Sequence, residues 1–204
     1  MIVVFGFVKK IVSSSLEKPK LLLAIVLVLL PIIFRIAAGF FVGVNFDANY
    51  NGFLAFTNIA LWLVSGIGLY AIIYIFKGSG VKGKLTGILT ATSYLSFFFT
   101  LFLLLAVIVI LLLVPGFYAG VKNAQGLDPE TAMQAFIESL PQPQNGLLFA
   151  AGMGILLLAG IAFLFFTLYL YYSIIALSST EKPKRNIFAL VFFMVFLLLL
   201  GLFI

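Results

Sequence analysis

The chain contains no cysteine and no histidine in its 204 residues. Without cysteine it forms no disulfide and offers no thiol nucleophile, and without histidine it lacks the usual imidazole base and a common metal ligand. Charged residues are also scarce, at 9%, whereas soluble domains carry about 25%. These absences exclude many classes of enzyme and argue against a water-soluble fold.

Apolar residues dominate instead: they make up 64% of the chain, and the mean hydropathy is +1.29. A membrane-spanning helix needs about 20 apolar residues plus a connection, so this length allows roughly four to six spans and no sizeable aqueous domain. We therefore predict an all-α fold, a polytopic transmembrane helix bundle with five spans. The predicted spans are residues 21–44, 53–76, 86–114, 147–177 and 186–204.

Residues 1–20 are predicted to form a separate cytosolic or interfacial segment before the transmembrane domain, residues 21–204. The first part of this segment, residues 1–12, is apolar but too short to span a bilayer. Two interpretations remain open. It forms an interfacial helix with Phe7 and Val8, together with Phe5, at the lipid headgroups, or it is a frayed tail.

The positions of the basic residues predict the orientation of the spans. Ten of the 12 lysines and arginines lie in three short segments, and these alternate with two segments that hold Lys122 as their only basic residue. Because basic loops stay on the cytoplasmic side, this pattern predicts five spans with the amino terminus inside and the carboxyl terminus outside. The basic segments are residues 9–20, 77–84 and 182–185, and the other two are residues 45–52 and 115–146.

The outer loop, residues 115–146, is the one long hydrophilic stretch, and a helix is predicted within it at about residues 129–140. Asp128 suits the N-cap position and Pro129 the first helical position. We expect this amphipathic helix to lie on the outer surface against the spans, because its apolar residues recur at helical spacing. Those residues are Met133, Phe136, Ile137 and Leu140.

Arg35 is the one ionisable residue deep in an apolar run, where a charge costs about 2.5–3.5 kcal/mol on insertion scales. That cost predicts a polar partner, either carbonyl groups freed by Pro31 or the amide of Asn58. One interpretation is a site for an anion or a lipid phosphate. The other is an arginine that is satisfied within the helix packing, and the lack of a second buried charge favours it.

The third span carries a polar seam formed by Thr90, Ser93, Tyr94 and Thr100. Such hydroxyls line water in a pore, or they bond to carbonyls of their own helix and bridge neighbouring helices. Packing is favoured, because no carboxylate, histidine or second seam faces them. Tyr171 and the tyrosines beside it are interpreted as an aromatic belt at the membrane boundary.

No paired carboxylates, metal-ligand cluster or serine with a neighbouring base is present in the sequence. We therefore predict that the chain is not an enzyme and has no catalytic, cofactor-binding or metal-binding residues. Nucleic-acid binding is not expected either, because the basic residues lie in short loops and form no long basic face.

Several short segments resemble those of a known family. They are Pro19 before the first span, residues 76–84 (FKGSGVKGK) followed by residues 90–94 (TATSY), and residues 181–185 (EKPKR) before the short last span. On these segments the chain resembles the Yip (Ypt-interacting protein) domain family of five-span membrane proteins, including prokaryotic members, over nearly its whole length. It departs from the family at Ser93, where the family has a glycine, and it lacks the acidic amino-terminal region of the eukaryotic members. The resemblance therefore implies five spans and a non-enzymatic role in membrane organisation or protein interaction, but not small-GTPase binding.

Three functions are considered on these grounds. The first is a non-catalytic integral membrane protein of the Yip type. The alternative is a small transporter or channel that uses Arg35 and the polar face of the third span, and the third is a non-catalytic subunit of a membrane complex. The expected partners are the bilayer, with anionic lipid headgroups at the inner face, and a second copy or another membrane protein. We expect a multi-pass protein of the cytoplasmic membrane, with an endomembrane as the alternative.

Overall fold

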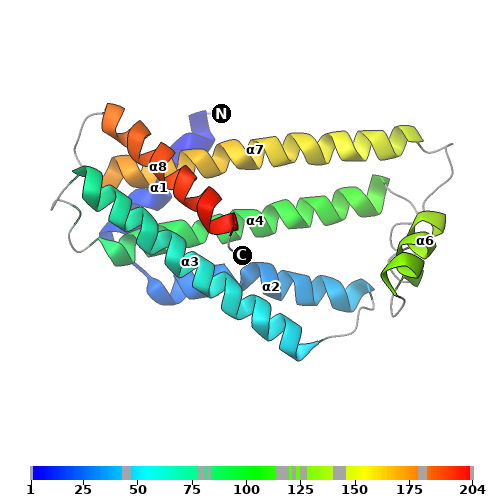
Figure 1. Ribbon diagram of the computed structural model, residues 1–204. Coiled ribbons are helices and arrows are strands. Elements are labelled where there is room, and N and C mark those ends of the chain that lie inside the picture. Colours follow the sequence, from blue (N-terminus) through cyan, green and yellow to red (C-terminus); the bar gives the residue numbers. More distant parts are fainter. Residues whose placement is uncertain are drawn as a thin grey trace. The chain divides into compact units, whose positions relative to one another are not determined.

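The computed structural model describes residues 2–42, 47–77, 81, 84–113, 120, 123–124, 128–139, 146–178 and 183–202 (Figure 1). Within these residues the regular elements are α-helices and no strand is found, which confirms the all-α prediction for this part of the chain. The helices are α1 (Ile2–Glu17), α2 (Leu21–Val42), α3 (Ala48–Lys77), α4 (Leu85–Leu113), α6 (Pro129–Ser139), α7 (Gly146–Ser178) and α8 (Pro183–Leu202).

Four of the described helices, α2, α3, α4 and α7, are long and apolar enough to cross a membrane. Their apolar segments have 20 to 29 residues, and about 20 residues suffice for a bilayer. These helices indicate an integral, multi-pass membrane protein. The apolar part of α8, Arg185–Gly201, is shorter, so the fifth span stays a prediction.

Helix α3 begins five residues before the predicted span, because Asp47 caps it. The Asp47 carboxylate oxygen Oδ1 accepts hydrogen bonds from the backbone N–H groups of Asn49 at 2.9 Å and Tyr50 at 3.1 Å. These bonds satisfy donors that the first turn of a helix leaves unpaired. Residues 48–52, predicted to lie in the connection between the first two spans, are therefore part of helix α3.

The predicted helix of the outer loop is present as α6, and Asp128 is its N-cap. Oδ1 of Asp128 accepts from the backbone N–H groups of Glu130 and Thr131, both at 3.2 Å. Hydrogen bonds from Thr131, followed by smaller contributions, hold the pKa of the Asp128 carboxyl below its ordinary value. Met133 is 61% exposed, whereas the other three predicted apolar positions lie outside the described side chains.

The chain divides into two compact units, which we describe separately. Unit 1 consists of Met1–Leu30, Phe53–Phe97 and Phe165–Ile204, and unit 2 of Pro31–Gly52 and Phe98–Leu164. Each of the four long helices thus contributes one part to each unit. Pro31, which lies inside the continuous helix α2, marks one of these divisions.

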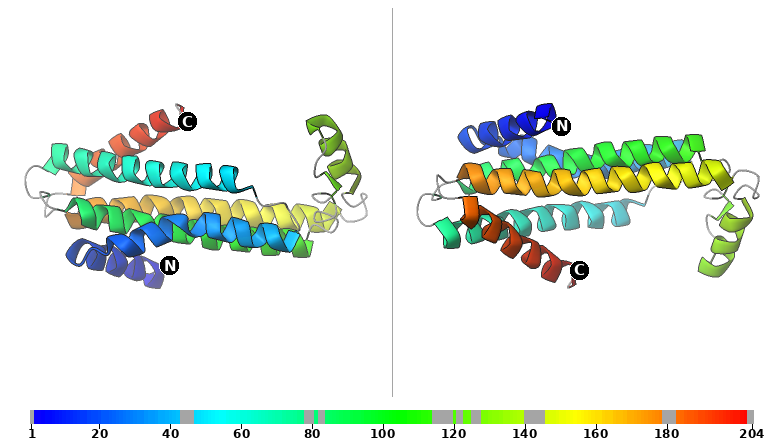
Figure 2. Two further views of the ribbon diagram at one scale, coloured as in Figure 1. Left: turned by 90° about the horizontal axis from the view of Figure 1, so that it is seen from below. Right: turned by 90° about the horizontal axis from the view of Figure 1, so that it is seen from above.

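The core of unit 1 gathers fully buried apolar side chains from five helices, with α1 and α8 on opposite sides of it (Figure 2). Because each helix turns an apolar stripe towards the same centre, burial in this core stabilises α1 and α8 as well as the longer helices. The principal members are Val8 and Val12 of α1, Leu69 and Ile73 of α3, Ile88 of α4, Ile174 of α7 and Phe193 of α8.

Helix α1 packs along its length against the other helices of unit 1. Val8 and Val12 are both 0% exposed, so the expectation that Val8 faces the lipid headgroups is wrong. At the other end of α1, the backbone approaches Gly87 of α4 closely. A Cβ atom placed on Gly87 would lie 2.9 Å from Cα of Leu16 and 3.1 Å from the carbonyl oxygen of Ser15. Only glycine permits this approach without a shift of the backbone.

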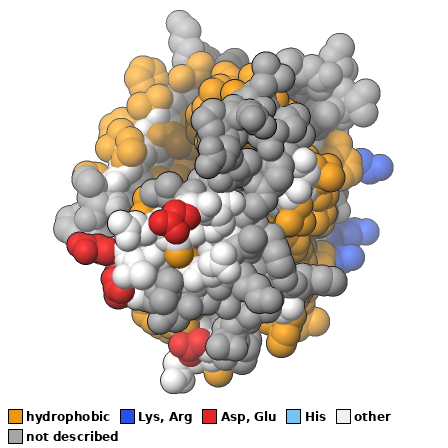
Figure 3. Space-filling model, turned by 90° about the vertical axis from the view of Figure 1, so that its right-hand side faces the viewer, with side chains coloured by type: hydrophobic (Ala, Val, Ile, Leu, Met, Phe, Trp, Pro, Cys, Tyr) orange, Lys and Arg blue, Asp and Glu red, His pale blue; other side chains and the backbone are white. Residues whose placement is uncertain are grey.

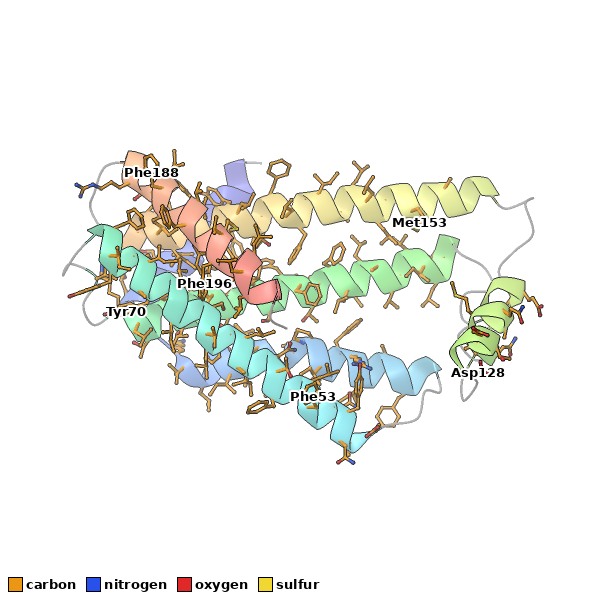
Figure 4. All side chains as sticks on the ribbon, viewed as in Figure 1. Phe53, Tyr70, Asp128, Met153, Phe188 and Phe196 are labelled. Atoms are coloured by element: carbon orange, nitrogen blue, oxygen red, sulfur yellow. The ribbon has the colours of Figure 1, made fainter. Side chains whose placement is uncertain are left out.

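Tyr171 belongs to the same core. Its side chain is 4% exposed, and its ring lies edge-on to that of Phe193 with the centroids 4.8 Å apart. The interpretation of Tyr171 as part of an aromatic belt is therefore wrong. The aromatic side chains that face outward in unit 1 include Phe188 on α8, which is 61% exposed and projects from the helix in Figure 4.

Within unit 2, α4 and α7 meet through phenylalanine rings. The ring of Phe163 lies 5.5 Å from that of Phe102 and 5.9 Å from that of Phe99, measured between centroids. Aromatic pairs at such separations add about 0.5–1.5 kcal/mol beyond their buried area. The bulky apolar residues of the sequence thus serve helix packing in this unit too.

Candidate functional site

Arg35 lies on α2 in unit 2, and its described partner is an aromatic ring. The guanidinium carbon lies 4.5 Å from the ring centroid of Tyr50, which is within the range of a cation–π interaction. Tyr50 belongs to the first turn of α3, which Asp47 fixes in place. Within the described part of the chain, Arg35 makes no hydrogen bond or ion pair with a protein group.

This geometry differs from the partners expected for Arg35. Asn58 is half-buried on α3 in unit 1, whereas Arg35 and Tyr50 both belong to unit 2. Tyr50 was not predicted as a partner, because residues 45–52 were placed in the connection between the first two spans. Asp47 could have predicted that a helix begins at residue 48, since an aspartate before a long apolar run is a helix N-cap pattern.

The polar seam of the third span is divided between the units, with Thr90, Ser93 and Tyr94 in unit 1 and Thr100 in unit 2. The hydroxyl of Thr90 donates to the carbonyl of Thr86 at 2.8 Å, and that of Ser93 donates to the carbonyl of Thr90 at 2.8 Å. Thr90 is 2% exposed and Ser93 is 0% exposed, while Tyr94 is half-buried. Bonds of buried hydroxyls to their own helix favour the packing interpretation in unit 1.

A further polar contact joins the start of α4 to the end of α7. The ammonium group Nζ of Lys84 donates to the backbone carbonyl of Ser178 at 3.0 Å, and the Ser178 hydroxyl donates to the carbonyl of Ile174 at 2.6 Å. A lysine at the carboxyl end of a helix satisfies free carbonyls and offsets the negative end of the helix dipole. Lys84 therefore has a structural partner in addition to its place in a basic loop.

A shallow groove of about 450 Å³ runs along the outer face of α1. Its lining includes Lys9, Lys10 and Lys18, all exposed, and Glu17, which accepts a hydrogen bond of 3.0 Å from the hydroxyl of Ser13. Because the opposite face of α1 is buried in the core, this basic face is held in a fixed position. It can attract anions without any rearrangement of the helix.

Asn186, near the start of α8, is a buried polar residue that the sequence did not single out. Its side chain is 5% exposed, and among the described residues Oδ1 has no hydrogen-bond partner. It is followed on the same face of α8 by Ala189 and Phe193, which belong to the core of unit 1. An unsatisfied buried carbonyl oxygen costs about 1–3 kcal/mol, so Asn186 is a weak point in the packing of α8.

Among the described residues, no three histidine, cysteine, aspartate or glutamate side chains gather into a group that could hold a metal ion. Among the polar groups that the structure describes, the Arg35–Tyr50 pair and the basic face of α1 are the two that are exposed and able to bind a ligand. No protein-family model, characterised protein or solved structure matches the chain.

Proposed function

We propose that the chain is a five-span integral membrane protein of the Yip type, with its amino terminus inside and its carboxyl terminus outside. It acts without catalysis, in membrane organisation or as a binding partner of another membrane protein. The observation that carries this proposal is the packing of α8, which supports a fifth span beside the four long apolar helices.

Helix α8 runs antiparallel to α3 within unit 1. The rings of Phe192 and Phe76 lie 5.2 Å apart, and one helical turn further along α8 the ring of Phe196 approaches Gly68, where an added Cβ would lie 2.5 Å from it (Figure 4). Residues later in α8 therefore contact residues earlier in α3. Because α8 packs antiparallel to the spanning helix α3, α8 enters the bilayer at the membrane face where α3 leaves it.

The outward face of α8 fits a lipid environment. It consists of large apolar side chains, each about half exposed or more, and no charged residue follows Arg185. Because the exposure of so much apolar surface to water is unfavourable, such a face is stable against lipid or another apolar helix. The residues are Ile187, Phe188, Val191, Phe192, Val195, Leu198 and Leu199.

The distribution of charge supports the proposed orientation. All the described lysines, together with Arg185, lie in unit 1, which also holds Glu17. Among its described residues, unit 2 holds Asp47 and the three acidic residues of α6 and its cap against Arg35. Figure 3 shows acidic side chains gathered on the face that carries α6. By the positive-inside rule the basic ends of the helices are cytoplasmic. The basic face of α1 then meets the inner leaflet, where anionic lipid headgroups are its natural partner.

Labelling of single cysteines with a membrane-impermeant reagent tests this topology, since the chain has no cysteine of its own. We introduce Ser79→Cys and Gln144→Cys, both outside the described residues, and Gly201→Cys near the end of α8. The proposal expects positions 144 and 201 to label from one face and position 79 from the other. Labelling of position 201 together with position 79 would show four spans and contradict the proposal.

The alternative of a channel or transporter needs water at the hydroxyls of the third span. In unit 1 the hydroxyls of Thr90 and Ser93 are buried and bonded within their own helix. We therefore favour the non-catalytic function.

A further inference from the structure

The position of Arg35 along α2 places its charge near one membrane boundary. The apolar segment of α2 ends at Phe40, five residues after Arg35 (35 to 40), which corresponds to roughly 7.5 Å of helix. Tyr50 lies at the start of α3, and its ring is 4.5 Å from the guanidinium. Tyrosine prefers the interface between the hydrocarbon and the headgroups. The guanidinium thus lies level with the end of α2 and the beginning of α3, rather than at the bilayer centre.

The chemistry of this pair leaves one side of the guanidinium available. The Tyr50 ring covers a face of the planar group, but the N–H donors point along its edges and are not used by a described protein group. The carboxylate oxygen Oδ1 of Asp47 caps α3, and no ion pair between Asp47 and Arg35 is present among the described residues. Arg35 itself is exposed, so its donors are open to a molecule outside the protein.

We propose that Arg35 and Tyr50 form a binding site for the phosphate group of a phospholipid, in the leaflet next to the connection between α2 and α3. A guanidinium binds two phosphate oxygens at once through parallel hydrogen bonds, and the tyrosine ring keeps its plane in one orientation. The aliphatic stem of Arg35 lies along the apolar helix while its head reaches the headgroups. The lipid supplies the negative charge that this arginine otherwise lacks.

This inference rests on α2 and α3 being membrane spans, but not on the Yip-type role, the orientation or the fifth span. The cysteine labelling can therefore contradict the five-span topology while lipid binding at Arg35 is confirmed. Lipid binding at Arg35 can likewise be contradicted while the topology is confirmed. The occupant is a lipid phosphate rather than a free anion, because exposed apolar side chains such as Ile33 and Phe40 flank Arg35 on α2.

Native mass spectrometry of the full chain, purified with phosphatidylcholine, measures how much phospholipid stays bound. Arg35→Gln is expected to weaken phosphatidylcholine binding about tenfold, in line with loss of charge-assisted hydrogen bonds. Arg35→Lys retains the charge but loses the planar fork, so it should be intermediate. Tyr50→Phe keeps the ring and should bind as the parent does, whereas Tyr50→Leu should bind more weakly. Lys20→Gln, which removes the same charge from an exposed residue outside the groove of α1, is the matched control and should have no effect.

Two results would overturn the proposal. Unchanged phosphatidylcholine binding in Arg35→Gln, with unaltered Trp62 emission as evidence of intact folding, removes the role of Arg35. Displacement of the bound lipid by excess inorganic phosphate identifies a free-anion site instead.

The depth of the site is tested separately with Tyr50→Trp in a Trp62→Phe background. Lipids brominated near the headgroup should quench the fluorescence most strongly. Strongest quenching by lipids brominated at the chain ends contradicts the interfacial position.

Discussion

Replacing Gly87 with leucine is expected to release α1 from α4. A Cβ at position 87 lies 2.9 Å from Cα of Leu16, whereas carbon atoms pack at about 3.5–4.0 Å, so α1 must move by at least roughly 0.6 Å even for alanine. Overpacking of this kind costs about 1–3 kcal/mol, which the better helix propensity of alanine offsets by about 1 kcal/mol.

The cost of this overpacking must be compared with the free energy that α1 gains by packing against the rest of unit 1. Complete burial of a valine contributes about 1.5–3 kcal/mol, so Val8 and Val12 together contribute roughly 3–6 kcal/mol. Gly87→Ala therefore leaves α1 docked, with a small shift. The larger side chain in Gly87→Leu extends further into the backbone of α1, where no flexible group can yield, and its cost should exceed the gain from docking.

The reactivity of a single cysteine introduced as Val12→Cys reports the docking of α1. In the parent and in Gly87→Ala the thiol should react slowly with a maleimide, because position 12 is buried. In Gly87→Leu it should react nearly as fast as a cysteine at the exposed position 10. Gly160→Leu is the matched control, since nothing lies within 4 Å of a Cβ at that position. Slow labelling in a folded Gly87→Leu protein would refute the close approach of α1 to α4.

Two further predictions concern polar groups. Asn186→Leu removes a buried oxygen without a described partner and should raise the thermal unfolding temperature in detergent, whereas a lower temperature would reveal a partner for Oδ1. The lowered pKa of Asp128 stabilises α6 above the ordinary value of about 3.9 for aspartate, and this contribution is lost as the pH falls through the folded-state pKa. Amide hydrogen exchange in α6 should therefore accelerate in acid. Asp128→Asn, which still caps the helix, should remove Asp128's part of that dependence, and an identical acid transition in this variant would contradict the assignment.

The sequence was most informative where a long run of similar residues gives a strong signal. The helical fold of the described residues and the four long apolar helices were predictable, because the hydrophobic runs far exceed the length of a buried strand or short helix. The cap at Asp128 was also predictable, because aspartate followed by proline fits the N-cap and first helical positions well.

Features that depend on contacts between distant residues were missed. The docking of α1 rests on Gly87, which lies about 70 residues further along the chain, and a local pattern cannot show that a glycine faces another backbone. Tyr171 was misjudged for the same reason, since the Phe193 ring that buries it is on another helix. At Arg35 the need for a partner was predictable, but Tyr50 became visible only once Asp47 had placed the start of α3.

Trp62 gives this protein an internal optical reporter. It is the only tryptophan in the chain, it is 7% exposed, and its indole N–H donates to the carbonyl of Leu89 at 3.0 Å. This bond joins α3 to α4 within unit 1, and both residues belong to the small apolar cluster that includes Val28 of α2. Separation of α3 from α4 would expose the indole and alter the wavelength and intensity of its emission. The unlabelled wild-type chain can therefore report the opening of this helix pair in real time, without any added dye.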